Sequence, residues 1–172
     1  MNIFLIGFMG CGKSTLGKKL AKKMSYSFID LDKEIEISKN KSIQDIFNKD
    51  GESFFRDFET SWLSNYRGKY SIISLGGGTP CFNNNMKLIN SIGTSIYLKM
   101  NSGSLTTRLY NSKQKRPLIE QYKDDKVKLE EKITELLNIR ESYYHDADLI
   151  FEGAYMTDSK IELIIDAING NV

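Results

Sequence analysis

A glycine-rich stretch near the N-terminus has the residue types and spacing needed to bind a nucleotide. Residues 7–15 read Gly-Phe-Met-Gly-Cys-Gly-Lys-Ser-Thr, which fits the phosphate-loop pattern of Gly, four residues, Gly, Lys and Ser or Thr. Such a loop directs backbone N–H groups at phosphate oxygens, with a helix N-terminus behind them. Lys13 would reach the β- and γ-phosphates and Ser14 would be a ligand of Mg²⁺. The stretch predicts a bound nucleoside triphosphate and Mg²⁺, and it leaves the phosphoryl acceptor open.

Two carboxylates supply a second set of reactive groups. Asp30 and Asp32 follow a short apolar run, and alternate residues of an extended segment point to the same side. One carboxylate can help to hold Mg²⁺ through water, while the other can accept the proton of a substrate hydroxyl. A pair of acidic residues is also common at an ordinary helix N-terminus. The phosphate loop that precedes this pair is what favours a catalytic role.

Three arginines and a run of glycines complete the candidate site. Arg56 can pair with Glu59 one helical turn later, which would orient its guanidinium to bind a carboxylate bidentately. Residues 76–78 are all glycine and allow the backbone to approach a ligand closely. Arg116 lies in a basic segment with few apolar residues, and a closing loop can deliver such an arginine to a transferring phosphoryl group. Arg140, taken alone, is typical of a helix surface.

The apolar pattern predicts the elements that must position these residues. Buried strands are expected at 2–6, 27–29, 71–75, 94–98 and 148–151. Helices are expected at 13–24, around 35–37, and at 43–48, 52–65, 83–90, 102–110, 124–144 and 157–168. Ser42, Ser102 and Thr157 are the expected N-caps. On the last helix we expect burial of Ile161, Leu163, Ile164, Ile165 and Ile168.

Alternating strands and helices imply right-handed crossovers and a parallel sheet covered on both faces. We therefore expect a three-layer α/β fold with a five-stranded parallel sheet, in one domain over residues 1–172. Ligands of such folds bind at the carboxyl ends of the strands. The phosphate loop, the two aspartates and the glycine run all follow predicted strands, so they are expected to meet.

Composition restricts the class of protein. The chain has 172 residues, 40% hydrophobic and 27% charged, with a net charge of +2, which is too small to indicate nucleic acid or a membrane surface as a partner. No apolar run is long enough to span a membrane, and no signal peptide is expected. Cys11 and Cys81 are far apart, so a disulfide is not expected, and the single His145 excludes a His-rich metal site. We expect a cytoplasmic monomer.

Together the motifs resemble those of the shikimate kinase family, which is similar to the nucleoside monophosphate kinases among P-loop proteins. The resemblance extends from Asn2 to Ile168. Its motifs are residues 7–15, Asp30-Leu-Asp32, Gly51-Glu-Ser-Phe-Phe-Arg56 with Glu59, Leu75-Gly-Gly-Gly78, Arg116-Pro-Leu118, and Arg140 with Tyr144. The phosphate loop alone occurs in many NTPases, but the full set in this order is highly specific.

The resemblance implies that the chain transfers the γ-phosphoryl group of ATP to the 3-hydroxyl of shikimate, on the route to chorismate and aromatic amino acids. Asp32 would bind the acceptor hydroxyl as the base, and Lys13 and Arg116 would stabilise the transferring group. Mg²⁺ would be held by Ser14 with support from Asp30. ATP would contact Gly10, Cys11, Gly12, Lys13, Ser14, Thr15 and Arg116. Shikimate would contact Asp32, Arg56, Gly76, Gly77, Gly78 and Arg140. Residues 32–60 would be the substrate-binding segment and about 111–123 the lid.

Some positions depart from the family pattern. Leu31 stands where a small polar residue is common, Ile119 replaces a frequent Leu, and Arg108 lies one residue farther from Arg116 than expected for a contact near adenine. No arginine follows the fifth strand, so the loop 153–157 would cover adenine through its backbone. Cys11 would be a small spacer in the phosphate loop, or a partly exposed thiol that reagents modify and ATP protects.

Two other functions fit parts of the sequence. The first is another small-molecule kinase of this fold, acting on gluconate or a nucleotide. The glycine run with Phe55 and Arg56 argues against it. The second is a regulatory nucleotide-binding protein that has lost catalysis. The presence of Asp32, Arg56, Arg116 and Arg140 together argues against that class.

Overall fold

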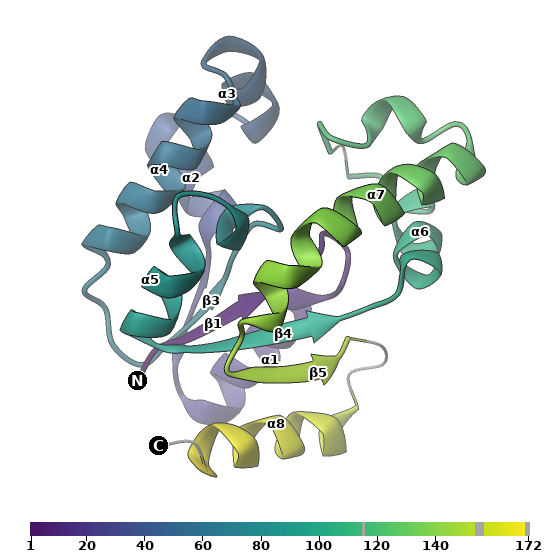
Figure 1. Ribbon diagram of the computed structural model, residues 1–172. Coiled ribbons are helices and arrows are strands. Elements are labelled where there is room, and N and C mark those ends of the chain that lie inside the picture. Colours follow the sequence, from purple (N-terminus) through teal and green to yellow (C-terminus); the bar gives the residue numbers. More distant parts are fainter. Residues whose placement is uncertain (115, 154–156, 171–172) are drawn as a thin grey trace.

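The computed structural model describes residues 1–114, 116–153 and 157–170. A parallel sheet lies at its centre, with helices on both faces (Figure 1). Its strand order is β2-β3-β1-β4-β5, and every neighbouring pair is parallel. The strands are β1 Ile3–Ile6, β2 Ser27–Asp30, β3 Ser71–Ser74, β4 Thr94–Lys99 and β5 Leu149–Glu152. The predicted three-layer α/β fold with five parallel strands is confirmed.

The central strands carry the most apolar sequences because both of their faces are covered. All four residues of β1 are fully buried, and β3 is buried along its whole length. In the register of the sheet Leu5 lies opposite Ser74 on one side and Ile96 on the other. This register brings the carboxyl ends of β3, β1 and β4 to the same edge.

Helices connect the strands and form the two outer layers. The helices are α1 Lys13–Met24, α2 Leu31–Lys39, α3 Ile43–Lys49, α4 Glu52–Asn65, α5 Asn85–Ile92, α6 Ser102–Tyr110, α7 Lys126–His145 and α8 Asp158–Gly170, with 3₁₀ turns η1 Thr79–Cys81 and η2 Glu120–Tyr122. Figure 1 shows α1 and α8 on one face of the sheet and α5 and α7 on the other. No helix in the described ranges is long and apolar enough to cross a membrane.

Several element boundaries differ from the predictions. The helix expected at 83–90 begins at Asn85, because Asn83 and Asn84 have left-handed φ angles of 50° and 56°. Asn101 rather than Ser102 caps α6, since its side chain accepts from Ser104 N–H at 2.8 Å. Ser42 caps α3 as predicted, with Asp45 N–H as the donor.

The buried face of α8 is narrower than predicted. Ile161, Ile164 and Ile168 are fully buried, and their spacing of three and four residues forms one helical stripe. Leu163 is 59% exposed and Ile165 only partly buried, so the expected burial of Leu163 is wrong and that of Ile165 is incomplete. The helix contacts the molecule along one side only, which leaves its other apolar residues facing out.

We expect Gly17→Ala to destabilise the protein, although alanine is the better helix former. A Cβ on Gly17 of α1 would lie 2.4 Å from Cε2 of Phe28 and 3.1 Å from Cδ1 of Leu5. Overpacking of this kind costs about 1–3 kcal/mol, which outweighs a helix-propensity gain of at most about 1 kcal/mol. Urea unfolding measures the change in free energy of unfolding.

Gly103→Ala is the matched control, because Gly103 is also helical and its added Cβ would meet no atom closer than 3.5 Å. This variant should match or slightly exceed the stability of the unmodified protein. Equal or greater stability of the Gly17 variant would show that α1 does not pack on the sheet as described.

Candidate active site

A cleft of about 700 Å³ opens at the carboxyl ends of the central strands. This volume lies within the range typical of small-molecule sites. One wall comes from the segment that contains α2, α3 and α4, and the other from the segment between α6 and α7 (Figure 1). The phosphate loop and the glycine run form part of its lining. The cleft therefore joins the segments that the sequence analysis selected separately.

The phosphate loop turns sharply between β1 and α1. Gly7, Gly10 and Gly12 have φ angles of 132°, 83° and 105°, in a region that side-chain-bearing residues rarely adopt. Lys13 is buried, and its Nζ donates to the carbonyl oxygens of Gly7 at 2.7 Å and Phe8 at 3.0 Å. Lys13 thus connects the start of the phosphate loop to α1, and it also lines the cleft.

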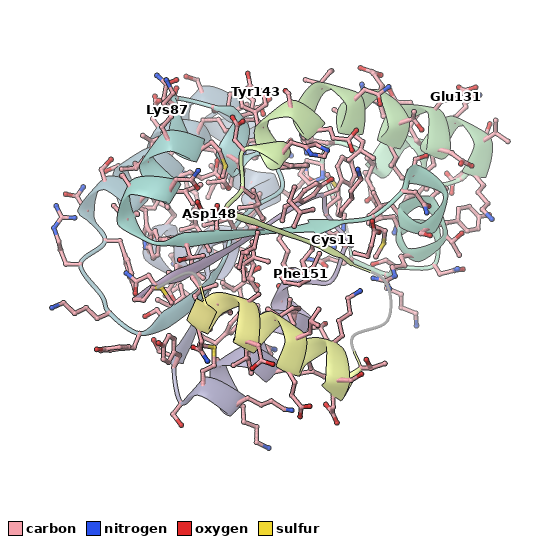
Figure 2. All side chains as sticks on the ribbon, turned by 60° about the horizontal axis from the view of Figure 1, so that its bottom comes forward. Cys11, Lys87, Glu131, Tyr143, Asp148 and Phe151 are labelled. Carbon is pink, nitrogen blue, oxygen red and sulfur yellow. The ribbon has the colours of Figure 1, made fainter. Side chains whose placement is uncertain are left out.

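The expectation of a partly exposed Cys11 thiol is wrong. Cys11 has no exposed surface, and it is absent from the cleft lining that includes Gly10, Gly12 and Thr15. Figure 2 shows Cys11 in the interior, whereas Lys87 stands at the margin of the molecule. Cys11 N–H donates to the Phe8 carbonyl, so the residue acts as a spacer that closes the loop.

Ser14 and Asp30 lie side by side in the cleft lining, where each presents an oxygen atom. Ser14 Oγ donates to Asp30 Oδ2 at 2.7 Å, and its oxygen lies 3.4 Å from Ser74 Oγ of β3. A hydroxyl and one carboxylate suit Mg²⁺, which commonly takes its remaining ligands from water and substrate phosphates. Among the described residues, no group of three His, Cys, Asp or Glu side chains could hold a metal ion by itself. The donor set therefore fits a metal that arrives with a polyphosphate.

Asp32 reaches the cleft by a different route from the one predicted. Asp30 ends β2 and Asp32 lies in the first turn of α2, so the two do not share an extended tip. Both carboxylates nevertheless line the cleft. Burial raises the pKa of Asp32, and the charge of Asp30 raises it further, whereas Lys13, Arg116 and Arg56 oppose the rise. Asp32 thus lies among cations that come from three separate segments.

Arg56 is held on two sides by carboxylates of its own helix. Glu59 Oε2 accepts from Nη1 at 2.8 Å, as the predicted pairing required. Glu52 Oε1 accepts from Nη2 at 2.8 Å and from Nε at 3.2 Å. Burial would lower the pKa of Arg56, but Glu59 and Glu52 outweigh burial and raise it. Glu59 is fully buried and also accepts a hydrogen bond from the Thr79 hydroxyl.

Arg140 is a buried residue of the cleft rather than a helix-surface arginine. It is 6% exposed, lines the cleft, and has its guanidinium carbon 5.5 Å from the ring centre of Phe8. Its buried Nη1 has no hydrogen-bond partner in the described part of the chain. One turn later, the buried Tyr144 donates its hydroxyl proton to the Gly77 carbonyl. The unpartnered nitrogen is a donor available to an anion in the cleft.

The glycine run lies against the charged side chains of the cleft. A Cβ on Gly76 would lie 2.9 Å from Asp32 Oδ1, and a Cβ on Gly78 would lie 2.6 Å from Arg56 Nη2. A Cβ on Gly77 would lie 3.2 Å from the Met9 backbone nitrogen. A side chain at these positions would therefore displace site groups, and this effect does not depend on unusual φ angles. The run keeps the acidic, basic and phosphate-loop groups close to one backbone.

Arg116 also lines the cleft, from the segment between α6 and α7. Its backbone N–H donates to Glu120 at 3.1 Å and its Nη2 to Gln114 at 3.0 Å. Among the described residues, its buried Nε has no hydrogen-bond partner. Burial lowers the pKa of Arg116, while the negative charge of Asp32 opposes this change.

Arg108 and the loop 153–157 are the two features that the sequence relates to adenine. Arg108 Nη1 donates to the Gly10 carbonyl at 3.3 Å, which places this arginine on the phosphate loop. The loop 153–157, expected to cover adenine, lies mostly outside the described residues.

The sequence analysis gave no role to several residues that complete the site. Thr79, Ser74 and Tyr144 each reach a site residue through a hydroxyl. Glu52 precedes Arg56 by four residues, a spacing at which helical side chains pair, so this contact could have been predicted. The others connect residues distant in sequence, and no local pattern indicates them.

The chain is similar in sequence to known shikimate kinases. The family model described as shikimate kinase matches residues 9–169. A shikimate kinase from Azobacteroides pseudotrichonymphae genomovar. CFP2 is 44% identical over 161 residues, covering 92% of this chain and 94% of the relative.

Solved structures agree. A shikimate kinase from Acinetobacter baumannii in complex with shikimate has a TM-score of 0.87 and 31% identity, covering 99% of this chain and 93% of that one. A gluconokinase from Sinorhizobium meliloti 1021, at a TM-score of 0.57 and 15% identity, covers 98% of this chain and 90% of that one, and it shares the fold alone. The chain belongs to the shikimate kinase family.

Proposed function

We propose that this chain transfers the γ-phosphoryl group of ATP to the 3-hydroxyl of shikimate, giving shikimate 3-phosphate and ADP for aromatic amino acid biosynthesis. Family membership supports the activity. The observation that carries the proposal is the position of Asp32, whose carboxylate interacts with Lys13 of the phosphate loop and with Arg56. An acceptor hydroxyl beside Asp32 would therefore lie between the phosphate site and a carboxylate-binding arginine.

The described contacts support a role for each charged group. Arg56 and Arg140 would bind the carboxylate of shikimate, because both are buried cations that line the cleft, and Arg140 Nη1 has no partner among the described residues. Asp32 would accept the proton of the 3-hydroxyl as its oxygen attacks phosphorus. Lys13 would exchange its two carbonyl partners for phosphate oxygens, and Lys13 with Arg116 would stabilise the charge on the transferring group.

The nucleotide would occupy the phosphate-loop end of the cleft. Gly10, Gly12, Ser14 and Thr15 line this end, and the backbone of Cys11 lies just behind it. Mg²⁺ bound to ATP would neutralise phosphate charge there, held by Ser14 with Asp30 beside it.

We further propose that residues 1–172 form a single domain, in which 32–60 bind shikimate and about 111–123 act as a lid. Both segments contribute to the cleft from opposite sides, which supports closure over the substrates. We also propose that the protein acts as a monomer. Cytoplasm, where ATP is available, is the proposed location.

Other acceptors fit the cleft less well. Gluconate also carries a carboxylate, but the gluconokinase likeness shows the fold alone. A nucleoside monophosphate would need arginines for its phosphate and an aromatic pocket for its base. The glycine run beside Phe55 and Arg56 in the cleft argues against such an acceptor.

A coupled assay that measures ADP release tests the proposed activity. The protein should turn over with ATP, Mg²⁺ and shikimate, and much more slowly with gluconate, a deoxynucleoside or a nucleoside monophosphate. Turnover of another acceptor but not of shikimate would refute the proposal.

Replacement of Asp32 by Asn should abolish most turnover and stabilise the fold. Loss of a general base costs about 10²–10⁴-fold in kcat, while ATP binding should stay near normal. The raised pKa of Asp32 means that the folded state holds its proton more tightly than the unfolded chain. The unmodified protein therefore loses stability as pH rises through the raised pKa, because the buried carboxylate then becomes charged. Asn stays uncharged, so the variant does not lose this stability at neutral pH.

Thermal unfolding of both proteins at several pH values measures this effect. The difference in melting temperature should be largest near neutral pH and shrink toward acid pH. In the unmodified enzyme, kcat should fall as pH drops through the raised pKa of Asp32. Full activity in the Asn variant would exclude Asp32 as the base.

Replacement of Arg140 by Ala should weaken shikimate binding far more than ATP binding. Removing one partner of a buried charge pair costs about 2–5 kcal/mol, because the other charge is left unpaired. Steady-state KM values for both substrates measure the change. An unchanged KM for shikimate would contradict the assignment of Arg140 to the carboxylate.

A further inference from the structure

The Arg56 guanidinium has five N–H groups, and the structure accounts for three of them. Glu52 accepts the one on Nε and one on Nη2, and Glu59 accepts one on Nη1. One N–H therefore remains on each Nη nitrogen. Two N–H groups on neighbouring nitrogens suit the two oxygens of a carboxylate. The ion pairs within α4 thus leave two N–H groups for a ligand, one on each Nη nitrogen.

The two carboxylates differ in their surroundings. Glu59 is fully buried, lines the cleft and has Thr79 as a second partner. Glu52 is the first residue of α4, its side chain is 45% exposed, and it does not line the cleft. Glu52 therefore contacts Arg56 from outside the site, where the substrate would not touch it.

Glu52 has a geometric effect that Glu59 cannot supply. Within the described part of the chain, Glu52 is the only hydrogen-bond partner of Arg56 Nε and Nη2. Glu59 binds a single nitrogen, around which the guanidinium could still swing. Contact with Nε and Nη2 at 3.2 Å and 2.8 Å defines the orientation of the planar group. Gly78 and the Phe82 ring, 4.5 Å from the guanidinium carbon, lie beside it.

We propose that Glu52 is a positioning residue for recognition of the acceptor carboxylate, acting through Arg56. It occupies the Nε side of the guanidinium and so directs the remaining Nη donors into the cleft, which Arg140 also lines. This inference rests on the proposed function, because it assumes that Arg56 binds the carboxylate of shikimate.

The exposure of Glu52 suits this role. Solvent screens a half-exposed carboxylate, so its charge should repel the incoming substrate anion less than that of a buried carboxylate. Arg56 is only 6% exposed, so loss of Glu52 leaves its Nε and Nη2 without their partner and should lower stability modestly. Separate measurements of shikimate binding, ATP binding and thermal unfolding distinguish an effect on recognition from an effect on folding.

The test compares Glu52→Ala and Glu52→Gln with the unmodified enzyme. Steady-state kinetics give kcat and the KM for each substrate, calorimetry gives the dissociation constant of shikimate without nucleotide, and thermal unfolding gives stability. The control is Glu135→Gln, which breaks a more exposed ion pair with Lys132 within α7, outside the cleft lining.

Glu52→Ala should raise the KM and dissociation constant of shikimate at least about fivefold with kcat nearly unchanged, since the carboxylate contact is the same in ground and transition states. The KM for ATP should stay within about twofold of its value in the unmodified enzyme, because the substitution weakens only the binding of shikimate. Glu52→Gln should fall between, because its amide oxygen can still accept from Arg56. The control should match the unmodified enzyme in every measurement.

Unchanged shikimate binding in both Glu52 variants would overturn the inference. Equal rises in both KM values with a lower melting temperature would indicate a purely structural role and would also overturn it. Should Glu52→Ala fail to fold, the nearly isosteric Gln variant still decides the outcome. Absence of shikimate turnover in the unmodified enzyme would instead refute the proposed function.

Discussion

The pairing of β1 with β3 is the constraint on which the rest of the site depends. The two strands are parallel, and Leu75 N–H continues their ladder by donating to the Leu5 carbonyl at 3.1 Å. The phosphate loop and the glycine run therefore leave the sheet side by side at the same level. A slip of one residue would reverse the faces of β3 and separate these segments. The donor and acceptor ends of the cleft are thus aligned by backbone hydrogen bonds between apolar strands.

Charge burial is the second organising feature. Arg56, Glu59 and Arg140 are almost completely removed from solvent. Isolated buried charges are costly, so each must be paired or await a ligand of opposite charge. Arg56 and Glu59 neutralise one another, whereas Arg140 keeps an unpartnered nitrogen. This inequality identifies the end of the cleft that is prepared for an anion.

The glycine run relates these two features to each other. Removing three Cβ atoms lets one short backbone segment touch Asp32, the phosphate loop and Arg56 in succession. Tyr144 then fixes the middle of the run through the Gly77 carbonyl, from the helix that also carries Arg140. Residues from four distant segments consequently share one rigid frame, which limits the reorganisation needed when substrates bind.

The sequence by itself determined the strand and helix alternation, the phosphate loop, the Arg56–Glu59 pair and the family motifs, because each follows from local spacing. It placed Asp32 on an extended tip, whereas Asp32 lies in a helix, and it left open whether Cys11 is a spacer or an exposed thiol, since burial and helix starts depend on packing against distant residues. The family motifs predicted Arg140 in the site, but only the tertiary structure decided that this arginine is buried and that the glycine run touches charged side chains. Those facts arise from strand order and helix docking, which bring together residues more than 60 positions apart, as Tyr144 and Gly77 are.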